Sequence, residues 1–225
     1  MTAIFAYVRG DRALIAADTL RRDPLGLFPD STVRKIYCWA DYILFAGAGN
    51  GPRLHRLASD MLANQGNYTP DEAGFMAAFQ AFQPTHYTNA TSGTSVATSV
   101  PRLTQGTFLV AVPELNGSPA KLFELDFAQG TRRDLPLNVA AQGTDPQLFL
   151  QIAQGAVITH SAAAGLAGDL WAGDCVNQAI AAYSLAVGLP FDVFVTRPSG
   201  SGGWLAHHQR LAAVPSSATA AFLVS

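Results

Sequence analysis

The order of the expected secondary-structure elements is the feature that most restricts how this chain can fold. Strand-like segments come first, then two helices, more strands, two further helices and two last strands. Such segregated runs argue against alternating β-α-β units and a parallel sheet. They favour an α+β fold in which two mostly antiparallel sheets pack together, with a helix pair on each outer face. No linker or internal repeat divides the chain, so we expect one domain over residues 1–225.

Strands are expected where β-branched and aromatic residues are bounded by turn signals. They fall at residues 3–9, 12–18, 33–39, 42–46, 107–112, 121–127, 137–141, 191–196 and 204–211. These strands are almost continuously apolar, which is typical of sheets that are covered on both faces. Residues 19–31 and 85–105 are expected to be irregular.

Four helices are expected. The first begins at Pro52 and carries leucines and a methionine at helical spacing. The run Thr69-Pro70-Asp71-Glu72 predicts the start of the second, with Thr69 as N-cap and acids near the positive end of the helix dipole. We expect Pro84 to end that helix. A third starts at Asp145-Pro146, and a fourth covers about residues 169–186.

Composition and charge narrow the classes of partner. The net charge of −2 predicts no basic patch for nucleic acid or anionic lipid. No apolar run reaches the ~18 residues of a membrane helix, and Arg9, Asp11 and Arg12 interrupt the first one too early for a signal peptide. Cys38 and Cys175 form no C-x-x-C pair, so we expect a reducing, cytoplasmic location. Charged residues make up only 13%, which indicates surface buried against other subunits.

Thr2 directly follows the initiator methionine, and a residue this small permits removal of Met1. A threonine hydroxyl is a weak nucleophile until a base takes its proton. The freed α-amine of Thr2 would have a pKa of ~7.7–8.0, so a neutral fraction is present near pH 7. Thr2 alone would then supply both the nucleophile and its base.

Two side chains and a glycine turn are placed to assist Thr2. The first hairpin returns Asp18, at the end of the second strand, to the start of the first strand. A buried Lys35 would stabilise an alkoxide-like state of Thr2, and Asp18 would hold that lysine charged. The turn at Gly47-Ala48-Gly49 can aim a backbone N–H at a developing oxyanion, because glycine lets substrate approach closely.

Four segments together resemble proteasome β subunits and the HslV peptidase, and are most similar to the bacterial proteasome homologues. They are Thr2-Ala3-Ile4, Ala16-Ala17-Asp18, Val33-Arg34-Lys35-Ile36 and Phe45-Ala46-Gly47. The resemblance implies the four-layer αββα sandwich of N-terminal-nucleophile (Ntn) hydrolases. It also implies a threonine endopeptidase in which the N-terminal threonine is the nucleophile, an aspartate and a lysine tune it, and a glycine amide forms the oxyanion hole. By this resemblance the roles fall on Thr2, Asp18, Lys35 and Gly47, with Gly49 as the alternative for the last.

The same resemblance implies an assembly. Identical subunits would form two stacked rings, of seven or alternatively six subunits, that enclose the active sites. Polypeptide substrates would be fed in by an ATP-dependent unfoldase. No metal or organic cofactor is implied, and neither a nucleic acid nor a membrane is an expected partner.

Further positions are expected at the site, and two of them depart from the family pattern. Val33, Tyr37 and Phe45 are expected to line the pocket for the side chain before the scissile bond, with Gly49 beside them. Gln142 stands where family members carry the serine of a Gly-Ser-Gly turn. Ser184 falls where they often carry a second aspartate. Gln142 and Ser184 are therefore the candidates for orienting the α-amine.

Other chemistry is less well supported by the residues. The glycine-rich run 47–51 precedes a helix as a dinucleotide fingerprint does, but Pro52 takes the place of the third glycine. The five histidines show no metal-ligand spacing, and no G-x-S-x-G elbow is present. Two functions stay open beside the peptidase. One is a ring-forming scaffold with the same fold and no proteolysis, and the other is an amidase acting on a small molecule.

Overall fold

The computed structural model describes residues 2–21, 31–49, 51–91, 106–160, 168–183, 187–200 and 202–212. Within these ranges the first sheet has the strand order β10-β1-β2-β11-β12, and all its neighbours are antiparallel. Its strands are β1 (Ala3–Arg9), β2 (Arg12–Asp18), β10 (Val139–Gly143), β11 (Phe191–Pro198) and β12 (Trp204–Leu211).

The second sheet is also antiparallel and has the order β5-β6-β7-β8-β9. Its strands are β5 (Ile36–Trp39), β6 (Ile43–Gly49), β7 (Gly106–Val112), β8 (Lys121–Asp126) and β9 (Arg132–Leu135). A short ladder of β3 (Leu20–Arg21) with β4 (Ser31–Thr32) lies outside both sheets. The helices are α1 (Gly51–Ala63), α2 (Glu72–Thr91), α4 (Pro146–His160) and α5 (Gly168–Ala182), with a 3₁₀ turn, η1, at Gln65–Asn67.

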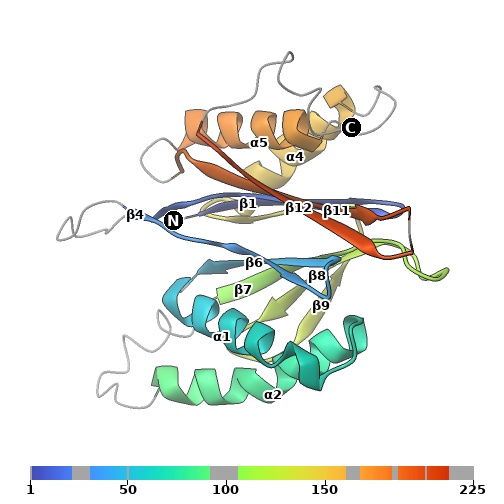
Figure 1. Ribbon diagram of the computed structural model, residues 1–225. Helices are drawn as coiled ribbons and strands as arrows, with labels where there is room; N and C mark the ends of the chain where they lie inside the picture. The colour runs from blue at the N-terminus through green and yellow to red at the C-terminus, as the bar shows by residue number, and fades with distance from the viewer. Residues whose placement is uncertain are drawn as a thin grey trace.

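The four layers are stacked in the order helix, sheet, sheet, helix. Figure 1 shows α4 and α5 over the first sheet, and α1 and α2 over the second. The α+β sandwich of two antiparallel sheets between two helix pairs, expected from the order of elements, is thereby confirmed. None of the helices in the described ranges is long and apolar enough to cross a membrane.

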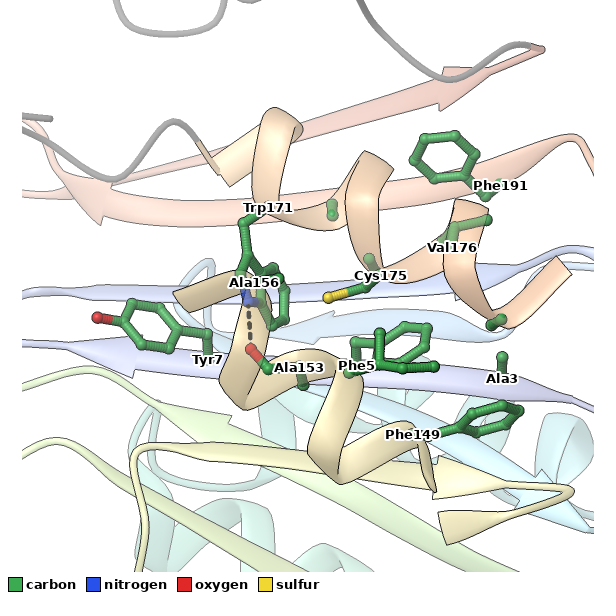
Figure 2. Close-up of a cluster of buried hydrophobic side chains, with 14 of the residues drawn as sticks. Ala3, Phe5, Tyr7, Phe149, Ala153, Ala156, Trp171, Cys175, Val176 and Phe191 are labelled. Carbon is green, nitrogen blue, oxygen red and sulfur yellow. Dashed lines mark hydrogen bonds between the residues drawn. The ribbon is translucent and has the colours of Figure 1, made fainter. Parts of the chain in front are cut away.

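Side chains of β1 alternate between two apolar layers, because successive residues of a strand point to opposite faces. Phe5 and Tyr7 face α4 and α5, where Phe5 packs against Phe149 with ring centroids 5.6 Å apart. Figure 2 shows this cluster, in which Trp171 of α5 donates its indole N–H to the carbonyl of Ala153 at 3.0 Å. Ile4 lies in the layer between the sheets, beside many alanines. The same alternation puts Thr2 on the inter-sheet face, at the open end of that layer.

The second helix differs from the expectation at both ends. Its N-cap is Asp71, not Thr69, because Asp71 Oδ1 accepts the N–H of Gly74 at 2.8 Å. Pro84 does not end the helix, which continues to Thr91. Side chains on both sides of the proline are held: Gln83 donates to the carbonyl of Phe127 at 2.6 Å, and the buried His86 makes a hydrogen bond of 2.8 Å with Asp60 of α1. Tertiary contacts therefore offset the hydrogen bond that proline cannot donate.

Two strand predictions also differ from the structure. The strand expected from residue 33 begins only at Ile36, because the N–H of Val33 turns away to the carbonyl of Thr19 at 2.8 Å. Strand β9 was not expected, since its sequence Arg-Arg-Asp-Leu carries no apolar pattern. The irregular segment 19–31 contains β3 and the start of β4 at its ends. Residues 22–30, 92–105 and 184–186 of the predicted segments lie outside the described residues.

Candidate active site

The start of β1 is fixed from both sides of the Thr2–Ala3 peptide bond. The N–H of Ala3 donates to Asp18 Oδ1 at 2.8 Å, and the carbonyl of Thr2 accepts from the N–H of Thr144 at 3.0 Å. Gly143 makes the second contact feasible, because a Cβ on it would lie 1.9 Å from the Thr2 carbonyl oxygen and its φ is +133°. These bonds fix the position of Thr2 at the open end of the layer between the two sheets.

Asp18 and Lys35 form a buried ion pair beside this strand. Lys35 Nζ donates to Asp18 Oδ1 at 2.9 Å and to the carbonyl of Leu20 at 3.2 Å. Asp18 is 0% exposed and Lys35 is 8% exposed. One carboxylate oxygen therefore receives both the ammonium and the N–H of Ala3, and it links Lys35 to the residue that follows Thr2.

Burial sets the electrostatics of this pair. Desolvation lowers the pKa of Lys35, and the neighbouring Asp18 carboxylate opposes that change. Desolvation likewise raises the pKa of Asp18, and Lys35 together with the N–H of Ala3 opposes it. Asp18 Oδ2 has no hydrogen-bond partner among the described residues. Both charges of the pair therefore lie in a poorly solvated place, where electrostatic interactions are screened less than in water.

The two glycines of the expected oxyanion turn differ in what surrounds them. The N–H of Gly47 donates to the carbonyl of Lys35 at 3.2 Å, so it belongs to the β5–β6 ladder. A Cβ on Gly47 would come within 3.1–3.2 Å of Leu54 and Phe108, so a glycine at this position allows α1 to pack closely on the sheet. Gly49 is exposed and has a φ of +119°.

A cavity of about 890 Å³ opens at the end of the inter-sheet layer where Thr2 lies. Six of the residues on its wall carry the argument below: Thr2, Gly49, Glu124, Asp126, Arg133 and Gln142. Gln142 Nε2 donates to Glu124 Oε1 at 2.9 Å and so bridges the two sheets. The cavity therefore brings strands from both sheets to one space beside the N-terminal strand.

The structure groups only part of the predicted site. Thr2, Gly49 and Gln142 line the cavity. Asp18 and Lys35 are not among its lining residues, but Asp18 is hydrogen-bonded to the N–H of Ala3, next to Thr2, and to Lys35.

The expected substrate-pocket residues are placed elsewhere. Phe45 is fully buried in the aromatic cluster of the second sheet, where its ring lies 5.3 Å from that of Tyr37. Tyr37 is 3% exposed and makes a hydrogen bond of 2.7 Å with His55 Nδ1. Neither residue is on the cavity wall, and the half-buried Val33 is not on it either. Ser184 lies outside the described residues.

Glu124, Asp126 and Arg133 are cavity residues that the sequence reasoning missed. In a sheet that is covered on both faces, a carboxylate within a strand has no solvent-facing side, and this signal could have drawn attention to Glu124. In the ranges that the structure describes, no group of three or more His, Cys, Asp and Glu is arranged to hold a metal ion.

Solved structures with the same architecture come from proteasome-like proteins. HslV from Trypanosoma brucei, a proteasome-like Ntn hydrolase, aligns with a TM-score of 0.58 and 16% identity over 87% of this chain and 99% of that chain. The Gly-1 mutant of Anbu, a proteasome-like homologue from Hyphomicrobium sp. strain MC1, aligns with a TM-score of 0.59 and 13% identity. That alignment covers 95% of this chain and 88% of the Anbu chain.

No protein-family model matches the chain, and no curated protein matches it. At such low identities the structural likeness shows the fold alone. The chain thus has the α+β sandwich of Ntn hydrolases that HslV and Anbu also have.

Proposed function

We propose that this chain is a subunit of a self-compartmentalising threonine endopeptidase, with Thr2 as the nucleophile after removal of Met1. The observation that carries the proposal is the buried Lys35–Asp18 pair, which is hydrogen-bonded to the residue directly after Thr2. A lysine and an aspartate 2.9 Å apart in the interior need a reason, because burying two charges costs several kcal/mol that a surface pair would not. Electrostatic activation of a neighbouring hydroxyl supplies that reason.

The reaction has two halves. Thr2 Oγ attacks the substrate carbonyl carbon and gives its proton to the α-amine of Thr2. The tetrahedral intermediate collapses to an ester on Thr2, and the departing amine takes the proton back from the α-ammonium. Water then attacks the ester with the α-amine as base, which releases the carboxylic acid and regenerates Thr2. Lys35 stabilises the anionic Oγ throughout, and Asp18 positions Lys35.

For the oxyanion donor we favour Gly49 over Gly47. The N–H of Gly47 already donates to Lys35, whereas Gly49 is on the cavity wall with Thr2. N–H groups two residues apart in a strand point to the same side, so the Gly49 N–H is directed past the start of β5. No β5 residue is paired there, because Val33 turns to Thr19 instead.

The proposed assembly is a homo-oligomer of two stacked rings in the cytoplasm, with seven subunits per ring or alternatively six. HslV-like structural neighbours support ring formation, and the low charge content is consistent with large interfaces. Polypeptides delivered by an ATP-dependent unfoldase are the proposed substrates.

One observation favours a second function, which is a scaffold that keeps the fold without proteolysis. Gln142 replaces the usual serine and donates to Glu124, so its amide N–H is not directed at the Thr2 amine. The unpartnered Gln142 Oε1 can still accept from that amine, and for this reason the peptidase remains our first proposal. Hydrolysis of a small amide is the third alternative, and the experiment below separates all three.

Intact-mass measurement tests the proposal. We expect purified protein to lack Met1 and to gain the mass of one β-lactone or epoxyketone probe per chain. The matched Thr2→Ala variant should gain none. Retention of Met1 on all chains would sink the peptidase, because Thr2 would then have no free amine.

The labelling outcome also ranks the alternatives. Labelling with turnover of peptide substrates supports the endopeptidase, whereas labelling without peptide turnover favours the small-molecule amidase. Loss of Met1 with no labelling favours the scaffold. Light scattering on the same sample should give the mass of two rings of seven, or alternatively six, subunits of 23.7 kDa each.

A further inference from the structure

The layer between the sheets changes from apolar to polar as it reaches the cavity. On β8 the inter-sheet side passes from the buried Leu122 to Glu124 and then to Asp126. On β10 it passes from Ala140 to Gln142. On β8 and β10 the change to polar side chains therefore comes at the end where Thr2 lies, next to the cavity.

Most of these polar groups are hydrogen-bond acceptors. Glu124 and Asp126 each bring a carboxylate, since both side chains are acceptor-only when ionised. Asp126 Oδ1 takes the N–H of Gln129 at 2.7 Å, and no hydrogen bond to its other oxygen is found among the described residues. Gln142 is only 5% exposed, yet its Oε1 has no partner in the described ranges. A buried acceptor without a donor is costly, and a ligand that donates would reduce the cost. Since an amide oxygen has two lone pairs, Gln142 Oε1 can accept from the Thr2 amine and from a ligand together.

Arg133 is the cation already at this wall, and it lies at the rim. Its Nε donates to Glu124 Oε2 at 2.8 Å, and its Nη2 donates to the same oxygen. The Arg133 side chain is 73% exposed, whereas that of Glu124 is 16% exposed. An ion pair with one exposed partner is weak, so a substrate cation can compete for Glu124. The side chains of the wall, Arg133 included, carry one net negative charge.

We propose that this cavity is a subsite for a cationic side chain, lysine or arginine, of the polypeptide substrate. This inference rests on the proposed peptidase function and adds a substrate class to it. Lysine and arginine side chains are donors without acceptors, which is the complement of Asp126, Glu124 and Gln142 Oε1. The cavity also has room for either side chain beside Thr2.

Binding to the Thr2→Ala variant tests the subsite without depending on catalysis. The probes are eight-residue polyalanine peptides in which one lysine is moved through every position. Norleucine and glutamate series have a side chain of similar length without the positive charge. Isothermal titration calorimetry should show that lysine at one position tightens binding by about tenfold over norleucine, as expected for charge-assisted hydrogen bonds.

Two variants in the Thr2→Ala background locate the effect. Asp126→Asn keeps an oxygen for the Gln129 N–H and removes the charge, so it should reduce the lysine preference by about tenfold. Glu124→Gln should reduce it as well. Asp134→Asn is the matched control, because Asp134 is a β9 carboxylate that is 71% exposed and absent from the cavity wall. The preference should survive in that control.

Each outcome decides the proposal. Equal binding of lysine and norleucine at every position, or a preference for glutamate, would overturn the cationic subsite. So would a lysine preference that Asp126→Asn leaves unchanged. Probe labelling of wild-type Thr2 is scored separately, so the peptidase can stand while the subsite fails. Lysine-selective binding without any labelling would support the subsite and remove the peptidase.

Discussion

The buried pair of Lys35 and Asp18 is the residue-level feature on which the chemistry depends. Each charge compensates the burial of the other, and the shared Asp18 Oδ1 also holds the N–H of Ala3. A residue that only stabilised the fold could be apolar at this depth, because well-packed apolar groups commonly replace buried pairs without loss. The pair therefore supports the proposed action on Thr2 better than a role in stability alone.

Replacing Lys35 by alanine tests that explanation. We expect Lys35→Ala to slow labelling of Thr2 by about 100-fold or more, since preorganised charges contribute on that scale. Assembly should persist. The measurements are the rate of probe addition by mass spectrometry and the oligomer mass by light scattering.

Lys121→Ala is the control for removal of a lysine, because Lys121 pairs with Glu72 away from Thr2. It should label at the wild-type rate. A Lys35→Ala protein that lost its assembly but reacted normally as a monomer would contradict the electrostatic role.

At the scale of elements, the first strand is positioned by its two neighbours in the sheet. β2 supplies Asp18 for the N–H of Ala3, and β10 runs into Thr144, which binds the carbonyl of Thr2. The close approach at Gly143 is what lets β10 run this near to the chain start. The hydrogen bonds that hold β1 between its neighbours therefore also fix the position of Thr2 in the candidate site.

Gly143→Ala should displace Thr2, because the added Cβ would lie 1.9 Å from the Thr2 carbonyl oxygen. We expect the free energy of unfolding to fall by more than ~1 kcal/mol, with a parallel loss of Thr2 labelling. Urea denaturation at fixed protein concentration measures the first effect.

Gly155→Ala gives a control of opposite sign. Gly155 lies in α4, and apart from its own helix backbone no atom of the described residues lies within 4 Å of a Cβ added there. Alanine is the better helix former, so stability should rise by ~0.5–1 kcal/mol with labelling unchanged. Similar losses in both variants would mean that the Gly143 contact has no special role.

Local signals predicted most of the elements. The first hairpin, with its strands at residues 3–9 and 12–18, and the apolar spacing of α1 lie within short windows, and both are found in the structure. Pro84 misled the prediction because α2 continues past it, where it is held by contacts with residues distant in sequence. Strand β9 was missed because its pairing with β8, not its composition, makes it a strand.

The candidate site could likewise be predicted only in part from the sequence. Thr2, Asp18 and Lys35 could be brought together from one hairpin and the segment after it. The cavity could not, because it needs the register of β7, β8 and β10 across two sheets. Glu124 faces Gln142 only because both strands end at the same side of the sandwich.

At the scale of the whole molecule, the outer helices carry few charges. Ile158 of α4 is 79% exposed, which is the largest exposed fraction among the large apolar side chains of the described part. Exposed apolar residues on a protein with 13% charged residues are consistent with contacts between copies. The outer face of α4 is therefore a place where the proposed assembly can be probed.

Ile158→Glu should lower the oligomer mass, because a buried carboxylate without a partner opposes association. Light scattering at several protein concentrations measures the change, and circular dichroism checks the fold. Leu137→Glu is the control, at another exposed apolar position, in the β9–β10 turn, where we expect no change. An unaltered mass in Ile158→Glu would place the interface elsewhere.

The anchoring of the first strand has a practical consequence for anyone preparing this protein. Both fixing bonds use atoms on the carboxyl side of the Thr2 α-carbon, namely its own carbonyl and the next N–H. Neither bond involves the α-amino nitrogen of Thr2 or any group attached before it. A preparation that still carries Met1 or an N-terminal affinity tag should thus melt and scatter like the matured protein while being chemically inert. Correct folding is no proof of maturation, and purification tags belong at the other end.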